Sequence, residues 1–439
     1  MNKRRNVWVT GVIILLLAVI TACSSSDETG NEEDTSTENS DAVSLRVLHG
    51  YTGEQPQAPV FEPALENFDA SHDDIDLTIE ASAGNSIREK LLAEMAANSE
   101  PDVFTHWGVR RVENYIKSDK IADLSELIAE DSDLTDRFVD GSYNAIEYHG
   151  GVYGLPLSSY QYYLVINKAL FEEHGVEVPT TYDELVTAVN QFTEAGLIPF
   201  AANNHSARYM MLTWLAQKTT LDTLITNVTG EVPFGDELLQ AAEKAAELQR
   251  LGAFPEGKET LSTLQSLELF NSERSPMMYQ HSWTVGSIAP ELIDQVEVIP
   301  FPLADSEAEP TVIAGTGFFA FMSQKAYDDP EKREAAWELL KELTGPQVGK
   351  DFIEIAGNLT PVAVEHDRDK ASPVMNEVLD MAATSEKVIP SLDEQLTSQE
   401  VADNYWDLTD QLSLQAISPE DYVDAFNQMI QEYPNTQYE

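Results

Sequence analysis

Residues 149–167 read H-G-G-V-Y-G-L-P-L-S-S-Y-Q-Y-Y-L-V-I-N, and this stretch decides the fold that we expect for the whole chain. Its three glycines and Pro156 are typical of a turn. The aromatic and branched residues 160–166 that follow are typical of a buried β-strand. The sequence therefore predicts a turn that leads directly into a buried strand.

The residues that follow the strand predict the start of a helix. N-K-A-L-F at 167–171 leads to a glycine and then to P-T-T-Y-D-E-L at 179–185. Thr181 and Glu184 have the spacing of a capping box, in which each residue satisfies a backbone N–H of the other. We therefore expect a helix to begin directly after Thr181.

The order of these motifs resembles the family 1 extracellular solute-binding proteins, the sugar receptors of bacterial ABC importers. The motifs are G-L-P, Y-Y-L-V-I-N-K, F-E-E-H-G-V and P-T-T-Y-D-E-L. The resemblance implies an α/β fold of periplasmic-binding-protein type II, similar to maltose-binding protein, with two lobes and an interlobe cleft. It also implies that residues 157–161 lie at the mouth of that cleft.

Further motifs support the resemblance. P-D-V-F-T-H-W-G at 101–108 matches a loop that contributes to the cleft in sugar receptors, and A-G-L-I-P-F at 195–200 matches the family again. Ser282 and Trp283 stand where relatives carry G-S-W, and Glu273 replaces a glycine that precedes that motif in the family. The resemblance implies that Trp283 lies in the cleft.

The resemblance also implies three crossings between the lobes. We place them at residues 157–160, 313–317 and 358–361, where glycine and proline gather. An N-terminal lobe of residues 43–157 with 314–359 and a C-terminal lobe of residues 158–313 with 360–439 follow from this placement. We expect the lobes to close about these crossings when ligand binds.

Strand and helix patterns alternate in the first part of the chain. Residues 43–49, 75–80 and 101–108 read as strands, and Leu91 and Leu92 belong to the apolar face of a helix between the last two. This alternation predicts a mostly parallel sheet in each lobe, with ligands near the carboxyl ends of its strands. Residues 198–204 are expected to form another strand and loop.

The N-terminus resembles a lipoprotein signal peptide. Basic residues 3–5 precede an apolar run at 7–20, and I-T-A-C at 20–23 resembles a bacterial lipobox. We expect residues 1–22 to be removed and Cys23, the single cysteine, to carry a lipid. Residues 23–42 are polar and acidic, which is typical of a disordered tether.

The composition excludes several partners. The chain has 26 Lys and Arg against 76 Asp and Glu, a formal charge of -50. Nucleic acid and anionic lipid headgroups would be repelled by this charge. We interpret the acidity as a solvated surface suited to a saline or alkaline exterior, with an acidic docking tail as the alternative.

The sequence offers little for catalysis. It has no G-x-S-x-G elbow, P-loop, Rossmann glycine motif or H-E-x-x-H pair. Adjacent acidic residues are abundant, but so acidic a chain places such pairs on its surface in any case. We therefore expect a binding protein with no catalytic or metal-ligating residues and no cofactor.

Aromatic residues near the expected junction of the lobes are better candidates for function. An indole covers the apolar face of a pyranose, while carboxylates, amides and arginine pair with its hydroxyls. Each tryptophan has core packing as its alternative role, and Trp214 and Trp337 are expected to be packed. The candidate ligand-binding residues are Tyr51, Glu54, Trp107, Arg110, Tyr160, Asn203, Trp283, Gly315 and Trp406.

The function that we predict is a monomeric receptor, anchored by lipid to the extracellular face of the cell membrane. It binds a sugar or oligosaccharide and delivers it to the permease subunits of an ABC transporter. Two alternatives stay open. The same fold could bind a polyamine, a metal chelate or a peptide, or the chain could be a secreted glycoside hydrolase or lyase.

Overall fold

The computed structural model describes residues 42–435, apart from residues 54, 83–85, 135 and 397. The predicted signal peptide, Cys23, the tether up to residue 41 and Glu54 lie outside the described residues. No helix within the described residues is both long and apolar enough to cross a membrane.

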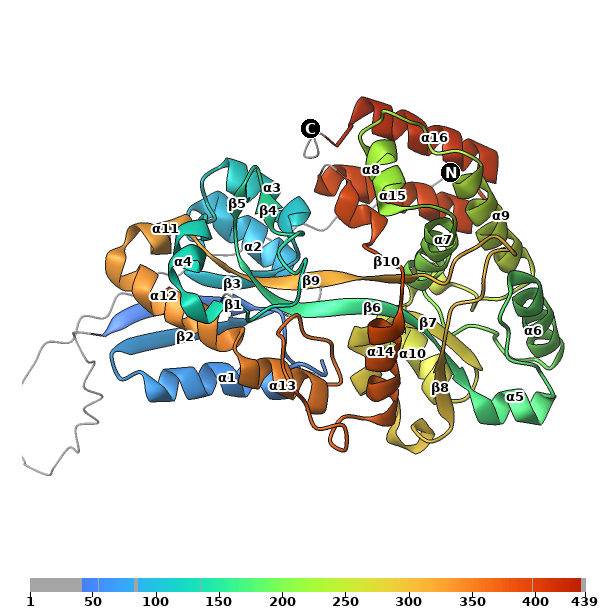
Figure 1. Ribbon diagram of the computed structural model, residues 1–439, viewed down its shortest axis with the longest axis horizontal. Helices are drawn as coiled ribbons and strands as arrows, with labels where there is room; N and C mark the ends of the chain where they lie inside the picture. The colour runs from blue at the N-terminus through green and yellow to red at the C-terminus, as the bar shows by residue number, and fades with distance from the viewer. Residues whose placement is uncertain (1–41, 54, 83–85, 135, 397, 436–439) are drawn as a thin grey trace, which may run out of the picture. The chain divides into compact units, whose positions relative to one another are not determined.

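The described strands form one eight-stranded sheet and a separate two-stranded sheet, with helices around them (Figure 1). The main sheet has the order β2-β1-β3-β9-β6-β7, with β8 paired to β6 and β10 paired to β9. The strands are β1 (Val43–His49), β2 (Ile75–Ala81), β3 (Val103–His106), β4 (Glu147–Tyr148), β5 (Gly151–Val152), β6 (Leu155–Asn167), β7 (Met277–His281), β8 (Val296–Ile299), β9 (Val312–Met322) and β10 (Val388–Ile389).

Two long strands, β6 and β9, belong to both halves of the sheet. Residues 319–322 of β9 pair with β3, and the first half of β6 pairs with β9 from Leu155 to Gln161. The second half of β6, from Tyr162, pairs with β7 and β8 instead. Figure 1 shows both strands running from one lobe into the other.

The two-lobed α/β prediction is confirmed, but the pairing within the sheet differs from the prediction. β1 is parallel to β2 and β3, as expected, whereas β9 and β6 are antiparallel to their neighbours β3, β7 and β8. The reason is topological, because β9 returns from the second lobe and therefore enters the first sheet in the reverse direction. The sheet is mixed.

Helices cover both lobes. In the first lobe they are α1 (Ala58–Ser71), α2 (Ser86–Ala97), α3 (Val109–Lys117), α4 (Ser125–Glu130), α11 (Gln324–Asp328), α12 (Pro330–Leu343), α13 (Pro346–Glu354) and the 3-10 turn η1 (Ser132–Leu134). In the second they are α5 (Lys168–His174), α6 (Tyr182–Glu194), α7 (Asn204–Lys218), α8 (Leu221–Val228), α9 (Asp236–Arg250), α10 (Thr263–Asn271), α14 (Pro373–Thr384), α15 (Gln399–Ser413) and α16 (Pro419–Glu432), with the 3-10 turns η2 (Lys258–Thr260), η3 (Ser282–Ser287), η4 (Pro290–Leu292) and η5 (Leu392–Gln395).

Local sequence signals explain where several helices begin. The capping box at Thr181 and Glu184 is present at the start of α6, as predicted. At α12, the Asp329 side chain accepts hydrogen bonds from two backbone N–H groups, and Pro330 occupies the first turn, where no N–H is needed. These caps fix the start of each helix before its apolar face is buried.

Two local expectations were wrong. Leu92 is 59 % exposed, because its neighbour Leu91 takes the buried position and each helical residue turns the chain by about 100°. Residues 198–204 do not form a strand; Phe200 makes a single parallel bridge to Met277. Pro199 has no N–H to donate, and α7 begins only a few residues later.

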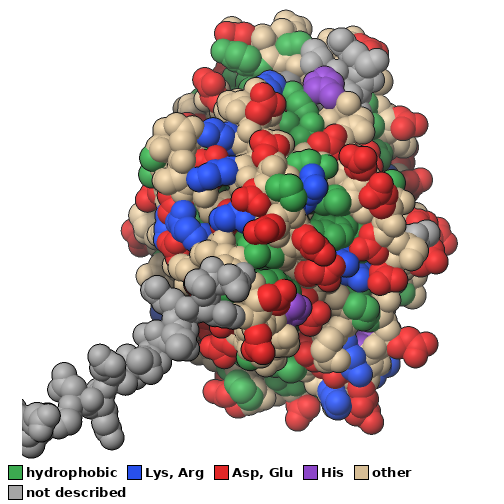
Figure 2. Space-filling model, turned by 90° about the vertical axis from the view of Figure 1, so that its left-hand side faces the viewer, with side chains coloured by type: hydrophobic (Ala, Val, Ile, Leu, Met, Phe, Trp, Pro, Cys, Tyr) green, Lys and Arg blue, Asp and Glu red, His purple; other side chains and the backbone are tan. Residues whose placement is uncertain are grey.

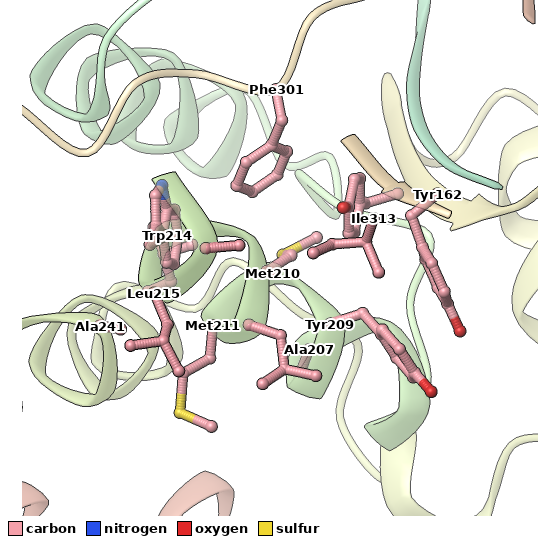
Figure 3. Close-up of a cluster of buried hydrophobic side chains, with 14 of the residues drawn as sticks. Tyr162, Ala207, Tyr209, Met210, Met211, Trp214, Leu215, Ala241, Phe301 and Ile313 are labelled. Carbon is pink, nitrogen blue, oxygen red and sulfur yellow. The ribbon is translucent and has the colours of Figure 1, made fainter. Parts of the chain in front are cut away.

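The core of the second lobe surrounds Trp214 (Figure 3). Trp214 is 1 % exposed and packs on Tyr182 and Phe301, each with ring centroids 5.2 Å away. Its indole N–H donates to the Pro302 carbonyl at 3.3 Å. The prediction that Trp214 is a core residue is confirmed, and Trp337 is likewise buried, in the first lobe.

Acidic side chains are spread over the surface that Figure 2 shows, the end of the molecule at the left of Figure 1. Lys and Arg are fewer on this face; several gather in one region and the others are scattered. Several cations of the first lobe are paired, and Arg46, for example, lies 2.8 Å from Glu80 and 3.1 Å from Glu94. The negative charge is therefore carried by solvated side chains.

Candidate ligand site at the junction of the lobes

Arg111 connects side chains of both lobes. It lies in the first turn of α3, and its guanidinium carbon is 5.0 Å from the ring centroid of Trp107 in the first lobe. The same carbon is 5.0 Å from the ring of Trp406 on α15 of the second lobe. Its Nη2 lies 3.7 Å from Oδ2 of Asp393 on η5. Arg111 is thus the centre of a contact between the lobes.

The first-lobe side of this contact is held rigidly. Trp107 follows β3 and packs edge-on against Phe318, with the ring centroids 5.1 Å apart. Gly108 separates Trp107 from α3, and a Cβ at this position would lie 2.5 Å from the Ala145 carbonyl oxygen. Only glycine fits such an approach, so the sequence W-G fixes the start of α3 and the direction of Arg111.

The second-lobe side contributes Arg208 and Trp406. The Arg208 guanidinium lies 5.3 Å from the Trp406 ring and 3.2 Å from the Asp410 carboxylate. Arg208 is 6 % exposed, yet its Nε has no hydrogen-bond partner among the described residues, and neither has Nε1 of Trp406. Unpaired buried N–H groups are uncommon in folded proteins because they are costly. These two donors suit a ligand hydroxyl.

Asp393 anchors a chain of hydroxyl groups behind Arg111. Its Oδ1 accepts hydrogen bonds from Tyr209, at 3.0 Å, and from Ser391. The Tyr209 ring stacks on Tyr162 at 3.9 Å, and the Tyr162 hydroxyl lies 2.7 Å from Nε2 of His205. Figure 3 shows the hydroxyls of Tyr162 and Tyr209 directed away from the Trp214 core. The aromatic core thus ends in polar groups at the junction.

Tyr160 and Glu394 form a second polar pair. The Tyr160 hydroxyl donates to Glu394 Oε2 at 2.8 Å and accepts from the Ser391 backbone N–H at 3.0 Å. Burial and the adjacent Asp393 charge raise the pKa of Glu394 to about 8, against the opposing effects of Tyr160 and Arg111. At neutral pH this side chain is therefore largely a neutral carboxylic acid, which can donate as well as accept.

Glycines of β9 let two rings lie directly on the strand. A Cβ at Gly317 would lie 2.8 Å from Tyr160 and 3.2 Å from Trp283, and a Cβ at Gly315 would lie 3.0 Å from the Tyr160 hydroxyl. The Trp283 N–H donates to the Ser159 carbonyl at 3.2 Å, and its ring lies 4.8 Å from that of His281. Trp283 is half-buried.

Four of the predicted aromatic residues therefore share one network of contacts. Trp107 and Trp406 meet through Arg111, Tyr160 joins them through Ser391, Glu394 and η5, and Trp283 joins through His281, whose ring lies 6.0 Å from that of Tyr162. Gly315 packs on Tyr160. We call this network the junction cluster; its members are Trp107, Arg111, Tyr160, Tyr162, His205, Arg208, Tyr209, His281, Trp283, Ser391, Asp393, Glu394, Trp406 and Asp410.

The other predicted residues lie beside the cluster. Tyr51 is buried in the first-lobe core, where its hydroxyl lies 2.8 Å from Ser158 Oγ. Asn203 caps α7 by accepting hydrogen bonds from the Ser206 backbone and hydroxyl. Arg110 is half-buried at the start of α3, next to Arg111. Tyr51 and Asn203 therefore have structural roles, Tyr51 in the first-lobe core and Asn203 as the N-cap of α7.

Several members of the junction cluster were not predicted. Arg111 was missed because nothing in the sequence R-R says which arginine faces the second lobe. Asp393 and Glu394 looked like an ordinary acidic pair of an acidic chain. Tyr162 lies in the predicted buried strand and Tyr209 was not singled out, and the rings of both belong to the core. No group of three or more potential metal ligands comes together among the described residues.

A separate cavity of about 310 Å³ lies in the second lobe, between the end of α9, η2 and the end of α15. Gln249, Phe254, Lys258 and Ser413 are among the residues that line it. Lys258 is almost fully buried there and donates to Gln249 at 2.7 Å. None of the residues that line this cavity belongs to the junction cluster.

Two lobes that share long strands, with aromatic and charged side chains meeting at their junction, define the periplasmic-binding-protein class, type II. The sequence gives the family within that class. Residues 52–350 match the model of the bacterial extracellular solute-binding proteins, and the chain belongs to this family. The resemblance inferred from the motifs is thus confirmed, and it places the chain in a family of extracellular transport proteins.

Known proteins are similar along most of the chain. The maltotriose-binding protein of Pyrococcus abyssi is 22 % identical over 353 residues, which are 78 % of this chain and 69 % of that protein. A structure from work on xylan utilization by Caldanaerobius polysaccharolyticus has a TM-score of 0.78 at 23 % identity, covering 89 % of this chain and all of that one. A chitin oligosaccharide binding protein has a TM-score of 0.78 at 20 % identity, covering 91 % and 100 %. These structures establish the same fold.

Proposed function

We propose that this protein binds a sugar or short oligosaccharide at the junction cluster and delivers it to an ABC permease. The observation that carries the proposal is the meeting of Trp107 and Trp406, from different lobes, on one guanidinium. The relatives whose names state a ligand, maltotriose and chitin oligosaccharide, support a carbohydrate.

The chemistry of the cluster suits a pyranose. Half-buried indoles of Trp107, Trp283 and Trp406 offer apolar faces for the C–H side of the ring. The Arg208 Nε and Trp406 Nε1 donors have no partner among the described residues, so ligand hydroxyls would complete their hydrogen bonding. Glu394, with its raised pKa, adds a group that both donates and accepts.

Closure of the lobes would allow the permease to distinguish the liganded protein from the free one. We place the lobes at residues 43–157 with 314–359 and at 158–313 with 360–439, with crossings at 157–160, 313–317 and 358–361. The sharing of β6 and β9 supports the first two crossings, and a hydrogen bond of 3.1 Å from the Ser159 N–H to the Leu359 carbonyl supports the third. A ligand that contacts both lobes favours the closed state, which the permease recognises.

We propose no catalytic step. The carboxylates of the cluster already serve other groups: Asp393 accepts from Tyr209 and Ser391, and Asp410 pairs with Arg208. Incubation with oligosaccharides followed by chromatography tests this point. Released shorter sugars would support the alternative of a glycoside hydrolase or lyase.

The anchor is proposed from the sequence alone. The basic start, the short apolar run and I-T-A-C at 20–23 support lipidation of Cys23 and display on the extracellular face of the membrane. We expect a Cys23→Ser change to release the protein from membranes into the soluble fraction. Full retention of the variant on membranes would contradict the lipid anchor.

A thermal-shift panel tests the ligand class. Mono-, di- and oligosaccharides, polyamines, metal chelates and peptides would be compared on the full-length protein, with calorimetry on any that act. A ligand at 100 times its dissociation constant stabilises the folded state by about 2.7 kcal/mol, which is a readily measured shift. We expect a sugar to act and the other classes not to. A shift with polyamine or peptide and none with any sugar would overturn the proposal.

A further inference from the structure

Arg111 occupies an unusual position for a cation. Its guanidinium carbon lies 5.0 Å from each of two indole centroids, so the rings of Trp107 and Trp406 are no more than about 10 Å apart. A guanidinium is planar and stacks on aromatic faces, as the apolar face of a sugar ring does. Arg111 therefore lies where a ligand ring shared by the two lobes would lie.

We propose that Arg111 is a resident substitute for the ligand: in the fraction of free molecules whose lobes are closed, its guanidinium bridges the two tryptophans, and in the liganded form a sugar ring takes its place. This inference rests on the proposed function, because it assigns the same site to the sugar. It differs from the usual role of an arginine that donates hydrogen bonds to the ligand. Here the side chain competes with the sugar.

The contacts of Arg111 are suited to reversible displacement. Its ion pair with Asp393 is 3.7 Å long, beyond the distance of a good hydrogen bond. Burial lowers the pKa of Arg111, the charge of Asp393 opposes this effect, and the nearby charge of Arg88 adds to it. Among the described residues, the guanidinium is therefore held by several weak contacts rather than by one strong one.

The partners that Arg111 would leave remain satisfied. Asp393 keeps the hydroxyl donors of Tyr209 and Ser391 on its other oxygen. Trp406 keeps the Arg208 guanidinium, which Asp410 holds at 3.2 Å. Departure of Arg111 thus exposes a stacking surface, and Asp393 loses the cation at 3.7 Å but keeps two hydroxyl donors.

The bridge has a consequence for affinity. If only a fraction of the free molecules has Arg111 withdrawn, the apparent dissociation constant is the intrinsic one divided by that fraction. Removing the bridge should therefore tighten binding. Cation–π contacts of this kind correspond to roughly a 3- to 30-fold change in affinity.

The test compares Arg111→Met with Lys117→Met in the full-length protein. Lys117 lies on the same helix, is exposed and pairs with Glu113 at 2.8 Å, so it controls for loss of a positive charge on α3. Without ligand, we expect Arg111→Met alone to show a larger radius of gyration by solution scattering and a changed tryptophan emission. With sugar, we expect it to bind roughly 3- to 30-fold more tightly than the wild type.

Two results would overturn the inference. Scattering and emission identical to those of the wild type would show that Arg111 bridges nothing, and a tenfold or greater loss of affinity would make Arg111 a ligand donor instead. The ligand-free measurements test the Arg111 bridge without any sugar. If no sugar binds the wild type, the proposed function is wrong, whatever those measurements show about the bridge. If Arg111→Met does not fold, Arg111→Lys, which keeps the charge but not the planar group, must give the same changes in the same direction.

Discussion

Two tryptophans of the second lobe, Trp214 and Trp406, show the difference between the core and the proposed site. Trp214 is 1 % exposed, its ring packs on other aromatic rings, and its N–H donates to the Pro302 carbonyl (Figure 3). Trp406 packs on the edge of the same hydrophobic core. However, the guanidinium carbons of Arg111 and Arg208 lie 5.0 and 5.3 Å from its ring centroid, and its buried N–H has no partner among the described residues.

The difference lies in hydrogen bonding rather than in residue type. A core gains stability by packing and by satisfying its few polar atoms internally. In the junction cluster, donors of Trp406 and Arg208 have no partner among the described residues, and charged groups lie in a half-buried place. Such an arrangement is stabilised when a polar ligand arrives, which is why we place the sugar there.

Replacing Trp214 by Ala should have the largest effect on stability. Removing a fully buried indole leaves a cavity, and the expected loss is about 3 to 5 kcal/mol of unfolding free energy. Affinity for the sugar should change little. Denaturant unfolding and calorimetric titration of the same variant measure the two quantities, and a large loss of affinity at unchanged stability would reverse the comparison.

Replacing Trp283 by Ala should affect binding instead. The half-buried indole would lose a stacking surface of about 1.5 to 3 kcal/mol, which is roughly a 10- to 150-fold loss of affinity. Its one hydrogen bond, to the Ser159 carbonyl, would also be lost, so we expect a small fall in melting temperature. A large fall with unchanged affinity would move Trp283 from the site to the core.

Replacing Glu394 by Gln should change the pH dependence of stability. The folded pKa of about 8 is above the ordinary 4.5, so the folded state holds the proton more tightly, and the stability that it contributes is complete below 4.5 and lost as pH rises toward 8. Gln cannot ionise beside Asp393. Relative to the wild type, the variant should gain on the order of 1 to 3 kcal/mol between about pH 5 and pH 9.

The control for this prediction is the exposed Glu386, replaced by Gln. Melting curves of both variants and the wild type across the pH range give the comparison. A constant difference between Glu394→Gln and the wild type at every pH would show that Glu394 is not held as a neutral acid.

Much of the fold was predictable because local patterns carry it. The first strand has the bounds that its sequence predicts, the capping box at Thr181 is present, and Trp214 is in the core. The direction of β9 could not be predicted in this way. Antiparallel pairing with β3 follows from a return out of the second lobe, more than 200 residues along the chain, which no local pattern records.

Members of the candidate site were predictable only where the residue type itself is informative. Indoles are large and chemically distinctive, so Trp107, Trp283 and Trp406 could be proposed from sequence. Choosing Arg111 over Arg110 requires the orientation of α3, which depends on the contact between Gly108 and Ala145. The acidic pair at Asp393 is one of many in this chain, and only the fold brings it to Arg111.

Amide hydrogen exchange with and without bound sugar tests the location of the site most directly. Our account predicts that a sugar identified in the thermal-shift panel slows exchange at residues 107–111, 159–162, 281–284, 391–394 and 404–410, which come from both lobes. Protection confined to residues 249–259 and 413–415, around the separate cavity of the second lobe, would contradict it.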